Sequence, residues 1–269
     1  MLRHAALGRV LPFGFGGRRS LLLIERNILV YKNGWLVILS GFFEPLFYLL
    51  SIGLGIGGIV GDLPGPNGTT IPYALFVAPA LLASASMNGA IAESTFNVFF
   101  KLNYQKTYDA VLATPLSPGD VALGEIGWAV IRSTLYALGF VVVILALGLV
   151  RSPWAVFAVP AATLLAFAFA AVGMAATTFM RSWQDFDLIN LVVLPLFLFS
   201  GTFYPLTAYP EPLRILVQLT PLWQGVDMIR ALVTGAVDPS ILWHVAYLGA
   251  MGLVGLVIVG RRLDRLLLK

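Results

Sequence analysis

The stretch FFKLNYQKTYDAVLATPLSPGDVALGE, Phe99–Glu125, is the longest polar interruption in the first half of a chain that is otherwise mostly apolar. Long apolar runs flank it on both sides, and it carries Lys101 and Lys106. Lys and Arg residues next to apolar spans mark the cytoplasmic side of a membrane protein. We therefore expect this stretch to be a cytoplasmic loop between two membrane spans.

Local signals predict a short helix inside this loop, from Tyr108 to Ala113. The hydroxyl of Thr107 can cap the helix by accepting a hydrogen bond from a free backbone N–H, and Pro115 ends it. A second helix is predicted to begin at Ser117-Pro118-Gly119-Asp120, which offers a capping Ser, a Pro at the first helical position and an acid in the first turn. A short helix between two spans offers a contact surface through which a cytoplasmic partner could move both spans.

The composition indicates a membrane protein rather than a soluble domain. Of 269 residues, 59% are hydrophobic and 11% are charged, and the mean hydropathy is +0.89, whereas a soluble domain carries about 25% charged residues. No cysteine is present, which excludes disulfides and thiolate metal sites. His4 and His244 lie far apart without ligand spacing, so no metal site is predicted. The net charge is +4, and the basic residues lie at span ends. This position indicates that they set the orientation in the membrane rather than bind nucleic acid.

We predict an all-α integral membrane protein whose transmembrane domain, residues 35–260, contains six transmembrane helices. Each apolar run is close to the roughly 20 residues needed to cross the hydrocarbon. The predicted spans are residues 35–58, 72–93, 120–150, 154–180, 187–205 and 240–260.

The N-terminal segment, residues 1–34, is basic and partly amphipathic. Charged residues that include Glu25, Arg26 and Lys32 lie mostly away from the apolar face. That face is formed by Leu21, Leu22, Ile24, Ile28 and Leu29. The pattern favours an amphipathic helix lying in the membrane interface. A disordered basic tail with a short helix is the alternative.

The positions of Lys and Arg set the expected orientation. Most of them lie in the N-terminal segment, the second loop, the fourth loop and the tail, residues 261–269, whereas the opposite side has only Arg151, Arg214 and Arg230. Both termini are therefore expected to be cytoplasmic, in the cytoplasmic membrane of a bacterium. An odd number of spans would contradict this charge bias.

The fifth connection, residues 201–239, is too long and too apolar for a simple loop. Prolines divide it into two short helical stretches, Glu211–Leu219 and Leu222–Thr234. Short broken helices beside a span suggest re-entrant segments on the outer face, whose backbone must be covered by protein or water.

Two ionisable residues, Glu44 and Arg132, lie deep within predicted spans. Both lie about 13 Å from the cytoplasmic face at 1.5 Å per residue, where an unpaired charge costs on the order of 3 kcal/mol. Equal depth favours an ion pair between them. The alternatives are a protonated Glu44, or an Arg132 that extends along its helix toward Glu125. Glu93 and Glu125, near the inner surface, are either solvated or paired with nearby basic residues.

Several stretches together resemble the permease subunits of ABC-2-type ABC exporters, above all those for lipo-oligosaccharides (nodulation factors), polysaccharides and drugs. No single motif decides the resemblance, which comes from the six-span layout and the order of the motifs over nearly the whole chain. The motifs are FEPLFYL at 43–49, YDAVLATPL at 108–116, GEIGWA at 124–129, FSGTFYP at 199–205 and TPLWQGVD at 220–227.

The resemblance implies that a separate ATP-binding subunit drives transport. Two permeases, as a homodimer or with a sister subunit, would rest on two copies of a separate ATP-binding subunit, which would hold ATP and Mg²⁺. The chain itself would be a transport subunit and not an enzyme, and would bind no cofactor. In agreement, it has no G-x-x-x-x-G-K-[ST] run that could hold phosphates. The N-terminal interfacial helix would contact the ATP-binding subunit, together with a coupling helix made of Tyr108, Asp109, Ala110, Val111, Leu112 and Ala113.

The resemblance also implies an outer gate and an amphiphilic cargo. The cargo would be a lipid-linked glycan, a glycolipid or a lipophilic drug. The gate would be formed by the helices after the fifth span, at Phe203, Tyr204, Pro205, Leu222 and Trp223.

Two other functions remain open from the residues alone. A secondary transporter driven by an ion gradient would need acidic residues at mid-membrane and an inverted repeat, but only Glu44 is a candidate and no repeat is clear. A membrane enzyme acting on lipids would need a cluster of His, Asp or Glu at one membrane face, and none is evident. Co-purification with an ATP-binding protein would separate the exporter from both alternatives.

Overall fold

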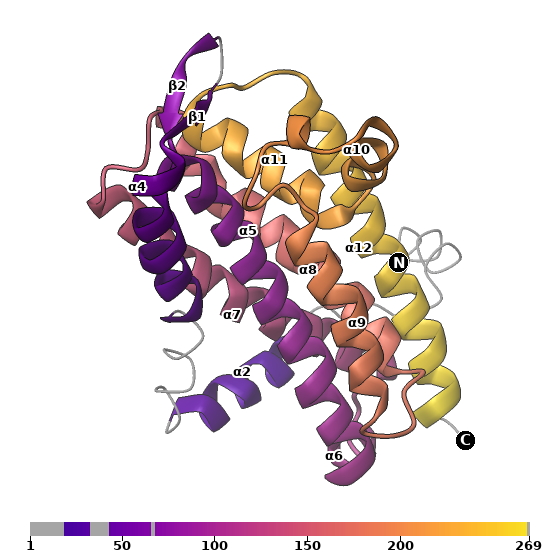
Figure 1. Cartoon of the computed structure of the whole chain (residues 1–269). Helices are drawn as coiled ribbons and strands as arrows, with labels where there is room; N and C mark the ends of the chain where they lie inside the picture. The colour runs from indigo at the N-terminus through magenta and orange to yellow at the C-terminus, as the bar shows by residue number, and fades with distance from the viewer. Residues whose placement is uncertain (1–18, 33–42, 66–67, 268–269) are drawn as a thin grey trace.

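The computed structural model describes residues 19–32, 43–65 and 68–267, and this part of the chain is a bundle of helices (Figure 1). Its only strands are two short ones in the first loop, Asp62–Pro64 (β1) and Thr70–Pro72 (β2), which pair antiparallel with Leu63 opposite Ile71. The expectation of an all-α architecture is confirmed apart from this hairpin. The first part of the predicted interfacial segment and residues 35–42 of the first predicted span lie outside the described residues.

Five helices within the described residues are long and apolar enough to cross a membrane. Two of them contain π-helical segments, which are rare and occur most often at functional sites. The five are Phe43–Val60, with η2 (Leu49–Ile56) and α4 (Gly57–Val60); Tyr73–Tyr104, with α5 (Tyr73–Ala92), η4 (Glu93–Asn97) and η5 (Phe100–Tyr104); α7 (Pro118–Ala146); Pro153–Thr177, with η6 (Pro153–Phe157) and α8 (Ala158–Thr177); and α12 (Ser240–Leu267).

Two of these helices run farther than predicted. The second was expected to end at residue 93 but continues to Tyr104, and the last enters the predicted tail and ends at Leu267. Polar residues such as Glu93 and Lys101 were taken to mark the end of the second span. The structure instead pairs both of them with charged side chains inside the bundle, so the helix continues past them.

The predicted span 187–205 is not a full membrane-crossing helix. It forms α9, Asp185–Leu198, whose 14 residues cover only about 21 Å of the roughly 30 Å hydrocarbon. The helix ends at Leu198, and the chain then turns at Gly201, which has φ +70°, a backbone conformation that favours glycine. The described chain therefore has five helices long enough to span a membrane, against six predicted spans.

The remaining helices are short. The two helical stretches predicted between residues 201 and 239 are present as α10 and α11, within two residues of their expected bounds. The short helices are α2 (Ser20–Tyr31), α6 (Thr107–Leu112), η7 (Leu206–Ala208), α10 (Glu211–Gln218) and α11 (Pro221–Thr234).

Helix α8 lies at the centre of the bundle, where it packs against α5, α7 and α12. Its buried face is rich in alanine, and the contact with α12 is close because Gly255 has no side chain. A Cβ atom at Gly255 would lie only 2.8 Å from the backbone carbon of Ala171. Small residues at helix contacts are the usual means of close packing in membranes.

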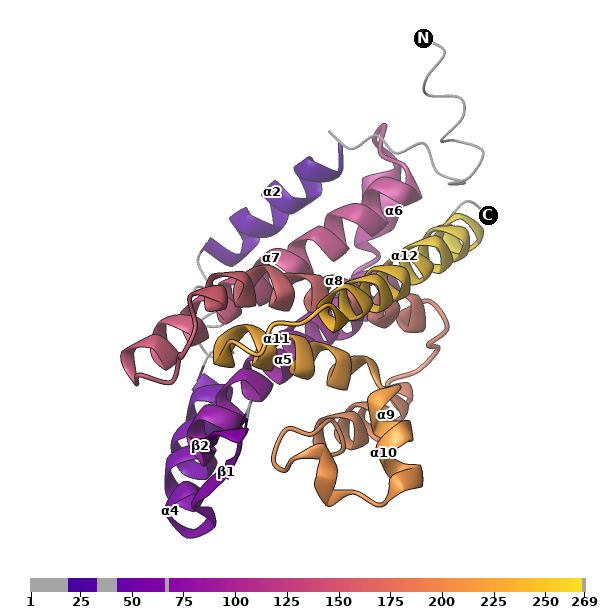
Figure 2. The same ribbon diagram turned by 90° about the horizontal axis from the view of Figure 1, so that it is seen from above.

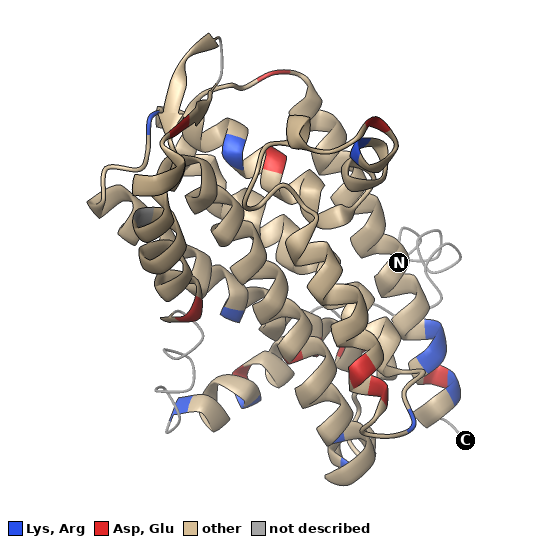
Figure 3. Cartoon of the chain, viewed as in Figure 1, with Lys and Arg blue, Asp and Glu red and all other residues tan. Residues whose placement is uncertain are grey.

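The bundle has two chemically different ends. One end, here called the α6 end, carries α6 and the last turns of α12, and the hairpin end carries β1, β2 and α10 (Figures 1 and 2). Among the described residues, most Lys and Arg residues lie at the α6 end, where Figure 3 also shows Asp and Glu residues. These basic residues are Arg19, Arg26, Lys32, Lys101, Lys106, Arg181, Arg261, Arg262 and Arg265.

Candidate functional site

Helix α6 begins abruptly because Lys106, the residue before it, has a left-handed backbone with φ +48°. Among the described residues, Lys106 is the only one other than glycine with positive φ. Thr107 was predicted to cap the helix, but it is the first helical residue and its hydroxyl bonds Gln105 instead. The left-handed turn at Lys106 replaces the cap.

The predicted restart after α6 is confirmed. Ser117 accepts a hydrogen bond from the Asp120 backbone N–H, and the Asp120 carboxylate accepts one from the Ser117 backbone N–H at 2.9 Å. This reciprocal capping box fixes the direction in which α7 leaves α6. Pro118 occupies the first helical position, as predicted.

One side of α6 packs against the rest of the protein, and the other side is exposed. Tyr108 is buried, with 1% of its surface exposed. Val111 and Leu112 are half-buried, whereas Asp109, Ala110 and Ala113 are exposed. The six residues of the predicted coupling helix therefore pack against the bundle on one side and are exposed on the other.

Beneath α6, Lys101, Glu125 and Asn27 form a buried cluster that joins three segments of the chain, here called the Lys101 cluster. The Lys101 ammonium donates to the Glu125 carboxylate at 2.7 Å and to the Asn27 side-chain oxygen at 3.3 Å. The Asn27 amide also donates to Glu125, at 3.2 Å. Burial and then the negative charge of Glu125 raise the pKa of Tyr108 well above its usual value. The cluster thus connects η5, α7 and α2 directly behind the anchor of α6.

Helix α2 lies on α7 with a narrow face. Ser20, Leu23 and Asn27 are its buried residues. The contact is close at Gly124, where a Cβ atom would lie 2.7 Å from the Cβ of Leu23. The start of α2 is also connected to the turn after α6, because Arg19 donates a hydrogen bond to the carbonyl of Pro115 at 2.7 Å.

The outward side of α2 has the mixed chemistry expected of a helix in a membrane interface. The charged residues singled out from the sequence sit at its rim, with Glu25 and Lys32 exposed and Arg26 half-buried. Large apolar side chains are exposed beside them. These are Leu21, Leu22, Ile28, Leu29 and Val30.

A second buried cluster, here called the Arg132 cluster, lies further along α7. Arg132 forms an ion pair with Glu93, whose other carboxylate oxygen accepts from the Trp128 indole at 2.9 Å. Arg132 also donates to Tyr136 at 2.7 Å, and its guanidinium lies over the ring of Tyr31 on α2, 5.1 Å from the centroid. Both clusters therefore connect α2 to the long helices of the bundle.

The predicted ion pair between Glu44 and Arg132 is wrong. Arg132 pairs with Glu93 instead, and no ion pair of Glu44 occurs within the described part of the chain. The error follows from the boundary of the second span: ending it at residue 93 placed Glu93 at the surface, whereas Glu93 lies eleven residues inside a helix that continues to Tyr104. The position of Trp128 one helical turn before Arg132 could have suggested a shared partner on a neighbouring helix.

Glu44 and Arg132 nevertheless line the same cavity, here called the inner cavity, of about 790 Å³. It lies between the first span, α5, α7 and α9. Its walls combine the side chains of Glu44, Arg132, Asp187 and Asn190 with apolar ones. Ser84, Asn88 and Tyr136 add polar groups, and Leu81, Leu191, Leu194 and Phe197 add apolar surface.

The residues predicted as an outer gate lie together at the hairpin end but in different settings. Leu222 is fully buried, Tyr204 is exposed, and Phe203, Pro205 and Trp223 are partly buried. The carbonyl of Phe203 accepts a hydrogen bond from Tyr73 at 3.0 Å. The ring of Phe203 packs edge-on against Phe197, with centroids 5.2 Å apart.

Sequence reasoning missed Arg230 as the residue that organises this end. Its guanidinium donates to the carbonyls of Phe76, at 3.2 Å, and Gly201, at 2.7 Å, and it lies over the Phe76 ring. The bend at Gly201 leaves backbone groups that an arginine can satisfy, which is the signal that could have identified it. Within the described ranges, no group of three or more His, Cys, Asp or Glu residues could hold a metal ion.

An anchored helix at one end of a bundle of membrane-length helices, with buried charges behind it, is consistent with the family suggested by the motifs. The family model described as the ABC-2 type transporter matches residues 19–234. The chain belongs to the ABC-2 type transporter family. The match extends from α2 through α11 and so contains both polar clusters and the inner cavity.

Curated relatives agree with this membership. The chain is 32% identical over 226 residues to nodulation protein J of Rhizobium leguminosarum bv. trifolii, covering 83% of this chain and 84% of the relative. It is 29% identical over 256 residues to nodulation protein J of Rhizobium leguminosarum bv. viciae, covering 93% and 97%. It is 27% identical over 190 residues to the inner membrane transport permease YadH of Escherichia coli, covering 69% and 67%.

Proposed function

We propose that this ABC-2 family member is the permease subunit of an ATP-driven exporter, moved by a separate ATP-binding subunit. The observation that carries the proposal is the Lys101 cluster behind the exposed helix α6. A force on α6 reaches Glu125 through the buried Tyr108, and from there reaches η5 and α2 through Lys101 and Asn27. Hydrogen bonds between charged groups are stronger than neutral ones, so they keep such segments together as they move.

The proposed orientation places the α6 end in the cytoplasm of a bacterium. The gathering of basic residues at that end supports it, because Lys and Arg are retained on the cytoplasmic side. The name of the relative YadH, an inner membrane transport permease, supports the bacterial inner membrane as the location. Both termini are cytoplasmic in this orientation, which requires an even number of crossings. Helix α9 and the non-helical residues 199–205 together provide the sixth.

The proposed partners are two copies of the ATP-binding subunit and a second permease, either a copy of this chain or a sister. Helix α6, through Asp109, Ala110 and Ala113, provides the contact with the ATP-binding subunit, together with the charged rim of α2. ATP and Mg²⁺ bind to that subunit, and hydrolysis occurs there. The permease contributes the path and not the chemistry.

The proposed cargo is an amphiphile: a lipid-linked glycan, a glycolipid or a lipophilic drug. The mixed lining of the inner cavity supports this choice, because it offers charged and amide groups for a polar head beside apolar surface for a tail. Without such a lining, a polar head group would enter lipid with its hydrogen bonds unmade, at a cost of several kcal/mol. The cargo would leave past the residues Phe203, Tyr204, Pro205, Leu222 and Trp223 at the hairpin end.

The decisive experiment compares two charge reversals on exposed aspartates at opposite ends of the bundle. The chain is co-expressed with a candidate ATP-binding protein, and co-purification and cargo-stimulated ATP hydrolysis are measured. Asp109→Lys on α6 should reduce stimulated hydrolysis at least tenfold at unchanged membrane levels, whereas Asp62→Lys on β1 should leave it unchanged.

Equal activity of Asp109→Lys and the wild type would contradict the proposed coupling surface. Transport by the chain alone along an ion gradient would favour a secondary transporter, because Glu44 and Asp187 both line the inner cavity.

A further inference from the structure

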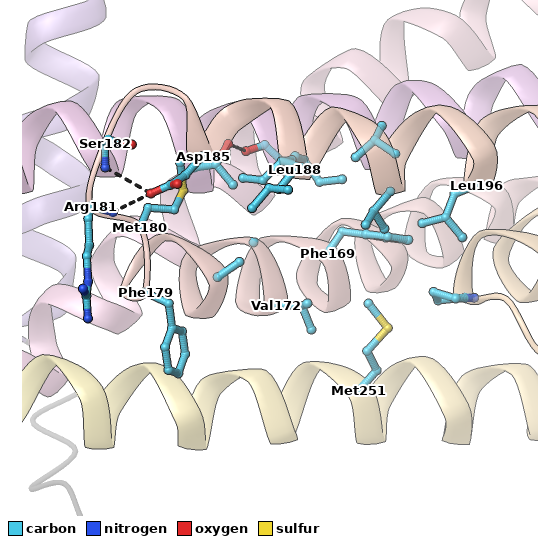
Figure 4. Close-up of a pocket in the computed structure, with 18 residues that line it drawn as sticks. Phe169, Val172, Phe179, Met180, Arg181, Ser182, Asp185, Leu188, Leu196 and Met251 are labelled. Carbon is cyan, nitrogen blue, oxygen red and sulfur yellow. Dashed lines mark hydrogen bonds between the residues drawn. The ribbon is translucent and has the colours of Figure 1, made fainter.

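A second cavity, of about 840 Å³, lies between α8, α9 and α12 (Figure 4). We call it the lateral groove. It lies on the opposite side of α9 from the inner cavity: Leu188 and Val192 face the groove, whereas Asn190 and Leu191 face the inner cavity. Its volume is within the range of about 300–1,000 Å³ that is typical of small-molecule sites.

The lining of the groove is apolar except at one end. Phe169, Val172 and Met251 are typical of its walls. Its polar residues gather at the α6 end, where Figure 4 shows Arg181, Ser182 and Asp185 together. An inner cavity with charges along its walls and a groove with charges only at its mouth are suited to different ligands.

Basic residues outnumber acidic ones around the mouth of the groove, where Arg181, Arg261, Arg262 and Arg265 lie at the same end of α9 and α12 as Asp185, Asp187 and Asp264. The Asp185 carboxylate is turned to the backbone, where it accepts hydrogen bonds from the N–H groups of Arg181 and Ser182 at 2.7 and 3.0 Å. The Arg181 side chain remains exposed. Arg262 on α12 donates to the carbonyl of Thr178 at 2.9 Å and lies over the ring of Phe179, a groove residue. The exposed Arg261 and Arg265 lie on the same end of α12.

The groove is about as deep as one leaflet of a bilayer. From Arg262 at the mouth to Met251 in the wall is eleven residues of α12, or about 16 Å. Half of the roughly 30 Å hydrocarbon is about 15 Å. A group that enters from the head-group region would therefore reach the middle of the membrane at the end of the groove.

The groove is open along one side, toward the surroundings of the bundle. Val192 and Phe179 line it yet keep 59% and 57% of their surface exposed. A volume of about 840 Å³ spread over about 16 Å gives a mean cross-section of roughly 50 Å². A section of this size admits a single hydrocarbon chain, and the basic residues at the mouth favour an anionic lipid over an apolar helix of a second copy.

We infer that the lateral groove binds one acyl chain of an anionic phospholipid, whose phosphate lies at Arg181 and Arg262. Naming the cytoplasmic leaflet as the source rests on the proposed orientation, but the site itself does not depend on transport. A bound chain fills the space behind α9 and supports the wall that Val193 shares with the inner cavity.

The test uses the full-length chain in nanodiscs of phosphatidylcholine and phosphatidylglycerol at three to one. A phosphatidylglycerol with a photoreactive diazirine in the middle of one acyl chain is cross-linked to the protein, and the labelled peptides are identified by mass spectrometry. Labelling is expected on the peptides that contain Leu188 to Val192 or Met251. Labelling of the lipid-exposed surface without these peptides would overturn the inference.

A matched pair of variants tests the groove itself. Val192→Trp places a ring in the groove and should reduce its labelling at least tenfold. Val254→Trp is the control, because Val254 is equally exposed, at 59%, but lies on a face of α12 outside the groove. Equal labelling in both variants would contradict an acyl chain in the groove.

A second pair tests the mouth. Arg181→Gln should reduce the preference for phosphatidylglycerol over an equivalent phosphatidylcholine probe about fivefold, the effect of the roughly 1 kcal/mol that one basic residue contributes at an anionic surface. Arg151→Gln, an exposed arginine outside the groove, should not change it. An unchanged preference in Arg181→Gln, or cross-links between two copies of the chain at Val192, would overturn the assignment.

Because binding is measured without an ATP-binding subunit, this result is independent of the proposed export function. A probe confined to the outer leaflet of a liposome would separate the two proposals. Groove labelling only from the leaflet opposite α6 would overturn the inference, because the mouth of the groove lies at the α6 end, and would leave the exporter proposal unchanged.

Discussion

The two ends of the bundle differ in how their buried charged side chains are satisfied. At the α6 end, charged side chains bind other side chains across helices, as in the pairs of Lys101 with Glu125 and Arg132 with Glu93. At the hairpin end, His244 contacts the side chains of Gln224 and Asp227. Several polar side chains at this end bind backbone carbonyls, as Arg19 and Arg262 do at the α6 end. Arg230 donates to the carbonyls of Phe76 and Gly201 in this way. Tyr73, Gln224 and Tyr247 do the same to the carbonyls of Phe203, Gln218 and Leu219.

The difference reflects the backbone at each end. The hairpin end contains the irregular segment from residue 199 to 205 before η7, where carbonyls without a helical partner need other donors. The ion-paired residues at the α6 end lie on helices whose own carbonyls are mostly bonded within the helix, so these side chains are available to connect one helix with another. Hydrogen bonds from side chains to backbone carbonyls stabilise the hairpin end. Ion pairs between side chains connect separate helices at the α6 end.

The largest effect should come from breaking the Arg132 cluster. Glu93→Ala leaves Arg132 buried without its carboxylate, and loss of one member of a buried ion pair costs about 3–5 kcal/mol. Glu44→Ala is the matched control and should cost less than about 1 kcal/mol, because Glu44 is exposed and unpaired within the described chain. Unfolding in mixed micelles would measure both, and a larger loss for Glu44→Ala would restore the pairing inferred from the sequence.

The next effect should appear at the hairpin end. Arg230→Ala removes donors from two carbonyls, and each buried group left unsatisfied costs about 1–3 kcal/mol. The loss should be local, so protease cleavage between residues 199 and 221 should increase while cleavage near α6 does not. Arg214→Ala, which removes one bond of 3.3 Å to the carbonyl of Tyr209, should have a smaller effect. Uniform cleavage at both ends would mean that the two ends are not independent.

Crowding the contact between α2 and α7 should have an intermediate effect. Gly124→Val forces α2 away because even a Cβ atom would lie 2.7 Å from Leu23, and overpacking costs about 1–3 kcal/mol. Since the chain has no cysteine, Ser20→Cys provides a single thiol on the buried face of α2, and its labelling by a maleimide should become faster. Gly249→Val is the control, because a Cβ there meets nothing within 4 Å. Unchanged labelling would show that α2 is not held at Gly124.

The smallest effect should come from the helix caps. Ser117→Ala removes the cap of α7 and should cost about 1 kcal/mol. Ser152→Ala, which removes a cap from the five-residue segment η6 near the hairpin end, should cost less, because a short exposed turn depends less on its cap. Melting temperatures of the two variants would rank them, and the reverse order would contradict the view that the α6 end relies on defined helix starts.

Sequence patterns predicted the elements better than their partners. The restart at Ser117, the short helix at α6 and the two helices after residue 210 follow from local signals of capping, proline and apolar periodicity. The end of the second span could not be found in this way. In a hydropathy pattern, Glu93 and Lys101 mark the end of a membrane span. In the structure, however, each forms an ion pair with a residue more than twenty positions away along the chain.

The same limitation affected the site. Depth along a span placed Glu44 and Arg132 at the same level, and both line the inner cavity, but depth does not determine which acid an arginine contacts. The partner depends on how α5 and α7 face each other, a three-dimensional property set by packing around Trp128. Arg230 was missed for a similar reason, because its role depends on the bend at Gly201, which is distant in sequence.

The second long helix, Tyr73–Tyr104, has a mechanical consequence. Its 32 residues extend about 48 Å at 1.5 Å per residue, well beyond the roughly 30 Å of hydrocarbon. In the proposed function it would act as a lever that tilts together with the helices packed on it, with α6 at the end that extends beyond the hydrocarbon. A tilt of about 10° at the fulcrum would swing a tip 25 Å away by roughly 4 Å, a displacement comparable to the shifts of packed helices in known switches.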